Sequence, residues 1–173
     1  MHIAQVNVAR ALDPLDSPAL ADFVAALAPV NALADAAPGF VWRLQTEDGD
    51  ATAVRIWDDP RVIVNLSVWA SLEALWTFVY GGAHVGVMQR RRQWFERPVE
   101  SHMALWWVPA GTTPTVAEAV ARLADHRRNG PAPRAFNFKH PFTPDGEPLD
   151  PAALRILPAG SAENPSSTVT PSR

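Results

Sequence analysis

The chain has 173 residues, of which 47% are hydrophobic and 19% charged, and its net charge is -3. A chain of this length and composition is expected to form one soluble domain with a sizeable core. The negative net charge gives no basic footprint, so nucleic acid is not expected as a partner. No apolar run approaches the roughly 20 residues that span a bilayer, so no membrane partner is expected.

The chain contains no cysteine, which excludes disulfides and thiolate metal sites. Its first ten residues lack the charged-then-apolar layout of a signal peptide. Both features favour a cytoplasmic location. Seven tryptophans accompany a single tyrosine. Because exposed rings would leave sticky patches, many of the tryptophans are expected to be buried or to line a cavity.

Residues 2–9 alternate as a strand with one apolar face and one mixed face that carries Gln5 and Asn7. A second strand, over 62–69, divides in the same way and carries Asn65 on its mixed face. The mixed faces indicate either a partly polar interior or an ordinary sheet face that meets water. Because strands disfavour Asn, these polar side chains are expected to bind a ligand, a partner subunit or a buried water.

A helix is predicted between the first two strands. Ser17 is a good N-cap, and an apolar stripe continues to about Ala37. Pro29 is expected to kink or divide this helix, because proline removes a backbone donor and clashes with the preceding turn. A strand over 40–45 follows, with a less certain short strand over 53–57.

After the 62–69 strand, Ser71 predicts a helix start and Gly81 its end. A second helix begins near His84. Residues three and four apart share one face of a helix, so this helix presents a stripe in which a histidine and an arginine lie among apolar side chains. The stripe consists of His84, Val87, Met88, Arg91 and Phe95. A mixed strand face followed by such a stripe indicates a lined pocket.

The last predicted strand, over 101–108, is rich in large rings. Thr115 and Glu118 form a capping box, which predicts a helix that ends near Gly130. An extended segment over 134–142 is expected to dock on the core.

The chain divides into a folded part over 1–142 and a C-terminal tail over 143–173. The tail is rich in proline, serine, glycine and alanine, and it is expected to be mostly flexible, above all beyond about Ala159.

The predicted elements contain the β-α-β-β-α-β order of a ferredoxin-like α+β unit, with an added C-terminal helix. Helices cover one face of such a sheet, and the other face needs a second cover. We therefore expect a homodimer in which two sheets form a dimeric α+β barrel with a cavity in each half.

Several segments resemble a bacterial domain family of unknown function within the dimeric α+β barrel (antibiotic biosynthesis monooxygenase-like) superfamily. They are residues 38–43 (PGFVWR), 65–69 (NLSVW), 91–95 (RRQWF), 105–111 (LWWVPAG) and 130–138 (GPAPRAFNF). The resemblance covers roughly 1–142 and implies the barrel and the dimer. It also implies that the helix with His84 and Arg91 borders the cavity. The superfamily includes cofactor-independent monooxygenases, haem-binding enzymes and isomerases, so the resemblance leaves the chemistry open.

Two side chains are the candidates for catalysis. His84 could act as a general acid or base, or as an axial haem ligand, or it could simply start a helix and face solvent. Arg91 could hold a carboxylate, phenolate or enolate, or it could belong to a solvated run of three arginines.

Three tryptophans are candidates for the wall of the pocket. Trp69, Trp94 and Trp106 either form an aromatic wall or serve as ordinary core, which is the commoner role of such rings.

Other chemistries lack their motifs. The chain has no Gly-rich phosphate loop, no GxSxG and no HExxH. The histidines show no paired metal-ligand spacing, so no metal site is expected.

The leading hypothesis is a small-molecule enzyme with a Trp-rich cavity that works without a cofactor. It would carry out proton abstraction or cofactor-independent oxygenation of an aromatic or polyketide-like substrate. His84 would be the acid/base, Arg91 would stabilise the anion, and Asn7 and Asn65 would orient the substrate. The alternatives are a haem protein with His84 as proximal ligand, a non-catalytic protein that binds a small apolar or aromatic molecule, and a dimer interface without any ligand.

Overall fold

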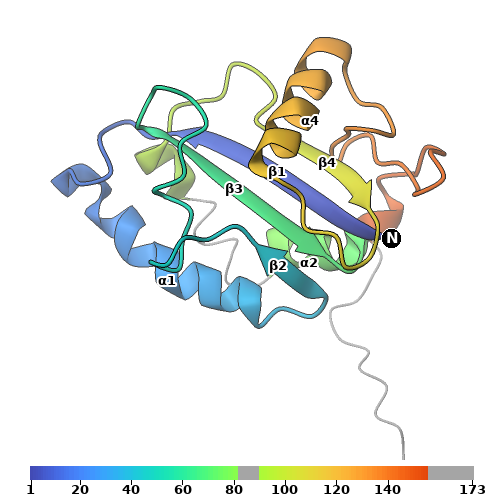
Figure 1. Ribbon diagram of the computed structural model, residues 1–173, viewed down its shortest axis with the longest axis horizontal. Coiled ribbons are helices and arrows are strands. Elements are labelled where there is room, and N and C mark those ends of the chain that lie inside the picture. Colours follow the sequence, from blue (N-terminus) through green and yellow to red (C-terminus); the bar gives the residue numbers. More distant parts are fainter. Residues whose placement is uncertain (82–89, 156–173) are drawn as a thin grey trace, which may run out of the picture.

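Four strands form one antiparallel sheet in the computed structural model, which describes residues 1–81 and 90–155. The strands are β1 (His2–Arg10), β2 (Phe40–Arg43), β3 (Val62–Trp69) and β4 (Met103–Val108), and their spatial order is β2-β3-β1-β4. Helix α1 (Ala21–Asp35) connects β1 to β2, and α2 (Leu72–Tyr80) follows β3 (Figure 1). This order is the ferredoxin-like arrangement, as the sequence predicts.

The central strands β1 and β3 place their polar residues on one face. Gln5 lies opposite Ser67, and Asn7 lies opposite Asn65. Because successive side chains of a strand alternate between faces, the register gathers these polar groups on the side of the sheet that also carries Trp69. The mixed face predicted from the sequence is therefore continuous across the two strands.

The opposite face of the sheet is apolar and is covered by α4 (Val116–Asn129), the added C-terminal helix (Figure 1). Leu123 of α4 is 1% exposed, and burial of such a side chain stabilises the fold by about 1.5–3 kcal/mol. Val54 and Ile56, from the connection between β2 and β3, pack against the same cluster. This face is thus largely covered within one chain, whereas the sequence argument for a dimer assumed that a second copy covers it.

Side-chain caps start two of the helices where the sequence predicts them. Ser71 Oγ accepts from the Ala74 N–H at 3.1 Å at the start of α2, and Thr115 Oγ1 accepts from the Glu118 N–H at 3.1 Å at the start of α4. The capping box at α4 is only half formed, because the Glu118 carboxylate accepts from Trp106 Nε1 at 3.0 Å. Among the described helices, none is both long and apolar enough to cross a membrane.

Two details of local structure differ from expectation. The sequence predicts that Pro29 kinks or divides its helix, and the residue lies inside α1 without dividing it. The ring is on the exposed side, where the carbonyl that loses its backbone donor can meet water. Residues 53–57 are irregular and form no strand; Val54 and Ile56 are partly buried and pack against the core under α4.

The segment after α4 docks on the core, as predicted, and it does so along the free edge of β4. Phe136 exchanges two backbone hydrogen bonds with Leu105, at 2.8 and 2.9 Å, and is fully buried. This pairing protects the edge of the sheet. The chain continues in contact with the domain beyond residue 142, because Leu154 is 4% exposed and packs in the cluster under α2.

Candidate functional site

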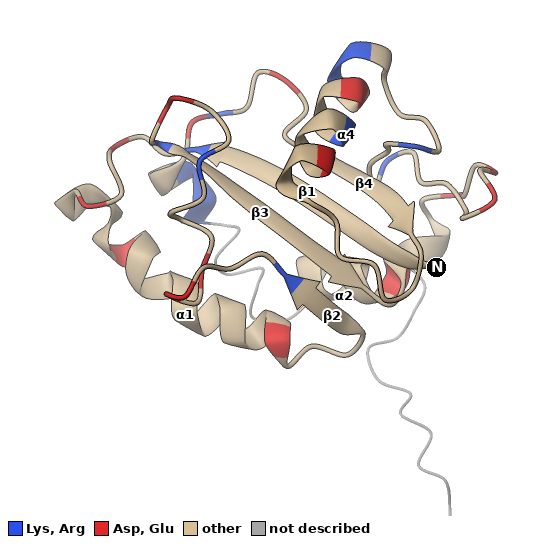
Figure 2. Ribbon diagram, viewed as in Figure 1, with Lys and Arg blue, Asp and Glu red and all other residues tan. Residues whose placement is uncertain are grey.

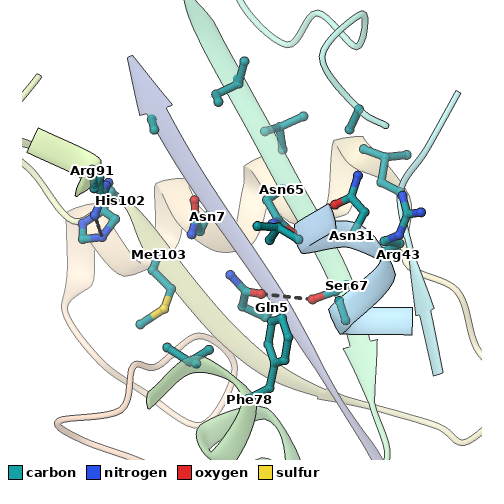
Figure 3. Close-up of a pocket in the computed structure, with 18 of the residues that line it drawn as sticks. Gln5, Asn7, Asn31, Arg43, Asn65, Ser67, Phe78, Arg91, His102 and Met103 are labelled. Carbon is teal, nitrogen blue, oxygen red and sulfur yellow. Dashed lines mark hydrogen bonds between the residues drawn. The ribbon is translucent and has the colours of Figure 1, made fainter. Parts of the chain in front are cut away.

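A cavity of about 500 Å³ lies on the polar face of the sheet. Its floor comes from β1 and β3, and its walls come from α1, α2, the helical residues 90–94 and the segment 137–139. Figure 3 shows the polar side chains of the two central strands directed into this space. The volume is that of a typical site for a small organic molecule.

Aromatic rings line the cavity at both ends. Trp69 stacks on Phe78 with ring centroids 4.9 Å apart, and Phe23 contacts Trp94 at 5.6 Å and Phe95 at 4.9 Å. All five residues line the cavity, and three of them, Trp69, Trp94 and Phe95, are candidates from the sequence. Such walls favour a flat, mostly apolar ligand.

A chain of hydrogen bonds crosses the floor. Trp69 Nε1 donates to Ser67 Oγ at 3.0 Å, and the Ser67 hydroxyl donates to Gln5 Oε1 at 3.0 Å. Gln5 and Ser67 are 7% and 5% exposed. Asn7 and Asn65 also line the cavity, with Asn7 partly buried and Asn65 exposed toward its opening. The three predicted polar residues are therefore brought together.

Arg91 and His102 meet at one side of the cavity, with Arg91 Nη1 3.2 Å from His102 Nε2. A guanidinium can only donate, so His102 Nε2 is the acceptor and the imidazole is neutral. Burial lowers the pKa of His102, and the nearby charges of Arg91 and then Arg127 lower it further. Burial also lowers the pKa of Arg91. Arg91 contacts no carboxylate among the described residues.

A second arginine in the wall, Arg43, is already neutralised. It forms a paired contact with the Asp35 carboxylate at 2.8 and 3.1 Å and donates to the Gly49 carbonyl at 2.8 Å. The contact lowers the pKa of Asp35. This salt bridge leaves Arg91 as the arginine of the described wall with an uncompensated charge.

Among the described residues, one predicted site residue lies elsewhere. Two others, His84 and Met88, lie outside the described residues. Trp106 lies on the opposite face of the sheet, beneath α4, and its indole N–H is bonded to Glu118. The sequence prediction for Trp106 needs correction. Met103 lines the cavity, and Trp106, three residues further along β4, points to the opposite face of the sheet.

His102 and Ser67 are site residues that the sequence analysis did not select. Ser67 alternates with Asn65 and Trp69 on the mixed face, and this pattern could have identified it. No such signal exists for His102. Strict alternation along 101–108 would place it with Trp106, but His102 precedes β4, which begins at Met103, and its ring reaches Arg91.

The described residues do not fit a haem group or a bound metal ion. A haem ligand needs a free histidine nitrogen, and the lining residue His102 uses Nε2 to accept from Arg91 and carries its proton on Nδ1. In the part of the chain that the structure describes, no group of His, Asp and Glu side chains is placed to hold a metal ion. The haem hypothesis rests on His84 and stays a prediction.

The fold and the site define a ferredoxin-like α+β domain with a ligand-sized cavity between its sheet and its helices. The chain belongs to the family described as a domain of unknown function (DUF3291), which matches residues 2–151. The resemblance to a family of unknown function is thereby confirmed. A search of curated proteins finds no match to this chain.

Solved structures with similar folds share 19% sequence identity with the chain and cover 66% of it. SnoaB from Streptomyces nogalater, a cofactor-independent oxygenase, has a TM-score of 0.46, with 98% of its chain covered. NE2512 from Nitrosomonas europaea, a protein of unknown function, has a TM-score of 0.43, with 95% covered. A protein from Chloroflexus aurantiacus J-10-fl with the provisional name antibiotic biosynthesis monooxygenase has a TM-score of 0.41, with 98% covered.

Proposed function

We propose that the protein is an enzyme that removes a proton from a small aromatic or polyketide-like molecule bound in the cavity. The observation that carries the proposal is the partly buried guanidinium of Arg91, which contacts a neutral histidine and, among the described residues, no carboxylate. An uncompensated cation at an apolar cavity favours an anionic oxygen of a ligand. The aromatic walls supply the apolar contacts for the rest of the molecule.

The step consists of one proton transfer. A substrate C–H or O–H next to a carbonyl or ring loses its proton, and the charge that remains on oxygen is stabilised by Arg91. As Arg91 turns its N–H toward this oxygen, His102 Nε2 is released. Burial is the largest cause of the low pKa of His102, and the Arg91 charge lowers that pKa further. The new anion offsets the Arg91 charge, so the proton affinity of His102 rises as the proton arrives.

His84 is the base that the sequence predicts for the same step. His84 lies outside the described residues, so mutagenesis is used to decide which of the two histidines, His102 or His84, is the base. Replacement of His102 by Gln leaves proton abstraction intact if His84 is the base and removes it if His102 is the base. Oxygenation without a cofactor would begin with the same anion, which can pass an electron to dioxygen.

Proton abstraction can be measured with 2-tetralone, a bicyclic ketone, by following deuterium exchange next to its carbonyl by NMR in D₂O. The wild-type protein should accelerate exchange, and Arg91→Met should lose about a hundredfold of that acceleration because a donor to the developing anion is removed. Arg92→Met is the matched control, since Arg92 is exposed on the neighbouring position. Binding of the ketone without faster exchange would favour the non-catalytic alternative.

We further propose that the protein is a homodimer. The charged residues of α1 are Asp22 and Asp35, which lie at its two ends, so the middle of the helix carries no charge (Figure 2). Val24 and Leu33 of α1 and Val41 of the adjacent β2 are 43%, 44% and 41% exposed. A second copy would bury this surface. Sedimentation equilibrium should show a dimer that Leu33→Asp dissociates and Leu12→Asp does not, whereas a wild-type monomer would exclude the proposal.

A further inference from the structure

The hydrogen bonds of the cavity floor run in one direction only. An indole N–H can donate but cannot accept, so Trp69 must be the donor to Ser67 Oγ. Ser67 is 5% exposed, and its own hydroxyl proton therefore needs an acceptor within the protein. Gln5 Oε1, at 3.0 Å, is that acceptor.

This direction fixes the orientation of the Gln5 amide. The opposite orientation would place the Gln5 NH₂ against Ser67 Oγ and leave the serine proton without an acceptor, which is costly for a buried group. The NH₂ group is consequently turned away from Ser67, and Figure 3 shows the amide nitrogen directed toward the side of Asn7. Gln5 is 7% exposed and lines the cavity.

Among the described residues, the Gln5 NH₂ has no acceptor, and the side chain makes one hydrogen bond, which Oε1 accepts from Ser67. Gln5 is buried but its amide nitrogen is accessible from the cavity, so a ligand in the cavity can accept a hydrogen bond from it. The hydrogen-bond chain from Trp69 through Ser67 to Gln5, called the relay below, fixes the orientation of the Gln5 amide. The site therefore offers a hydrogen-bond donor at this point and no acceptor. The matching ligand group is an oxygen that only accepts.

We infer that Gln5 binds a carbonyl oxygen of the substrate and that Ser67 and Trp69 are positioning residues that hold its amide in the donor orientation. With the anionic oxygen at Arg91, which rests on the function proposed above, the substrate class is an aromatic ketone or quinone that carries an acidic oxygen at a second position. Asn7 and Asn65 lie beside Gln5 along the floor and contact the same part of the ligand.

A matched pair of probes tests this inference by calorimetry. 9,10-Anthraquinone-2-carboxylate and anthracene-2-carboxylate have the same three rings and the same acidic group, and they differ in the two carbonyl oxygens. The chain has no cysteine, so the quinone cannot be captured by a thiol. The wild-type protein should bind the quinone about tenfold more tightly than the hydrocarbon, as one satisfied buried donor predicts.

The variants of the relay should change this ratio and leave the hydrocarbon almost unaffected. Gln5→Met should bring the ratio close to one, and Gln5→Glu should reverse it because a carboxylate repels a carbonyl oxygen. Ser67→Ala should reduce the ratio, since the amide is then free to turn. Gln45→Met, at an exposed glutamine, is the control and should leave the ratio unchanged. Equal wild-type affinities, or a quinone preference that survives Gln5→Met, would overturn the inference.

The proposed function and this inference can be tested separately with the same probes. Arg91→Met should weaken both probes by the same factor and keep their ratio, because both carry the carboxylate. A normal ratio with no effect of Arg91→Met would remove Arg91 from the function and leave Gln5 as the carbonyl site. Absence of binding by either probe would contradict both proposals.

Discussion

Arg91 Nη1 lies 3.2 Å from His102 Nε2, and this contact couples the charge of the arginine to the proton affinity of the histidine. The guanidinium keeps the imidazole neutral, and the imidazole holds the guanidinium without cancelling its charge. A carboxylate in place of His102 would compete with an anionic ligand. The pair therefore gives the cavity a positive charge that a ligand can neutralise.

Replacement of Arg91 by Met should raise the pKa of His102 toward its ordinary value. The recovery should be partial, because burial is the largest cause of the low pKa and Arg127 also contributes. NMR titration of the imidazole protons measures it. Arg92→Met is the control and should leave the titration of His102 unchanged, and an unchanged pKa in Arg91→Met would show that the two side chains do not interact in solution.

Acid should destabilise the protein through two histidines. The pKa values of His102 and His126 are both lowered from the ordinary value of 6.5, in each case chiefly by burial. Below that value the unfolded chain binds protons that the folded state does not, so the free energy of unfolding falls as pH drops from about 6.5 toward the folded pKa values. The slope contributed by each histidine is at most about 1.4 kcal/mol per pH unit.

Urea unfolding between pH 5 and pH 8 measures this dependence. His126 Nε2 is 3.0 Å from Asn137 Nδ2, so His126→Gln keeps an acceptor for the amide and removes the titration. His102→Gln removes the contribution of His102 to the pH dependence of the free energy of unfolding. Each variant should flatten the acid limb of the curve, and a variant with the wild-type slope would show that the replaced histidine titrates normally.

Trp106 and Trp69 should respond differently to replacement by Phe. Trp106→Phe removes the bond to Glu118 beneath α4 and should cost about 1–3 kcal/mol of stability with no change in the binding of the anthracene probe. Trp69→Phe removes the donor to Ser67 and should lower the quinone preference. Thermal unfolding and calorimetry together assign the two rings to opposite faces, and a loss of probe affinity in Trp106→Phe would contradict that assignment.

The two arginines of the cavity wall should also differ. Arg43→Met breaks the contact with Asp35 and should cost about 1 kcal/mol of stability or less, because the Asp35 side chain is 47% exposed. It should leave the affinity for anthracene-2-carboxylate unchanged, since the Arg43 charge is already compensated. Arg91→Met should weaken that affinity severalfold. Equal losses in both variants would indicate a general electrostatic effect of the cavity and no specific anion site at Arg91.

The sequence predicts the sheet well because alternation and caps are local signals. The strand at 62–69 and the cap at Ser71 occur as expected, and the mixed face with Gln5 and Asn65 proves continuous. Trp106 and His102 could not be placed from local patterns, because their surroundings depend on where β4 begins and on which face α4 covers. The position of Pro29 inside a continuous helix likewise depends on which side of α1 meets water.

The ionisation of bound 4-nitrophenol tests the central claim, that Arg91 stabilises an anionic oxygen in the cavity. The phenolate absorbs at longer wavelength than the phenol, so a pH titration followed by absorbance gives the pKa of the bound probe. In the wild-type protein this pKa should lie about one unit or more below the value for the free phenol, as expected for a cation within contact distance, and Arg91→Met should abolish the shift. The same pKa for the bound phenol in the wild-type and Arg91→Met proteins would contradict the account.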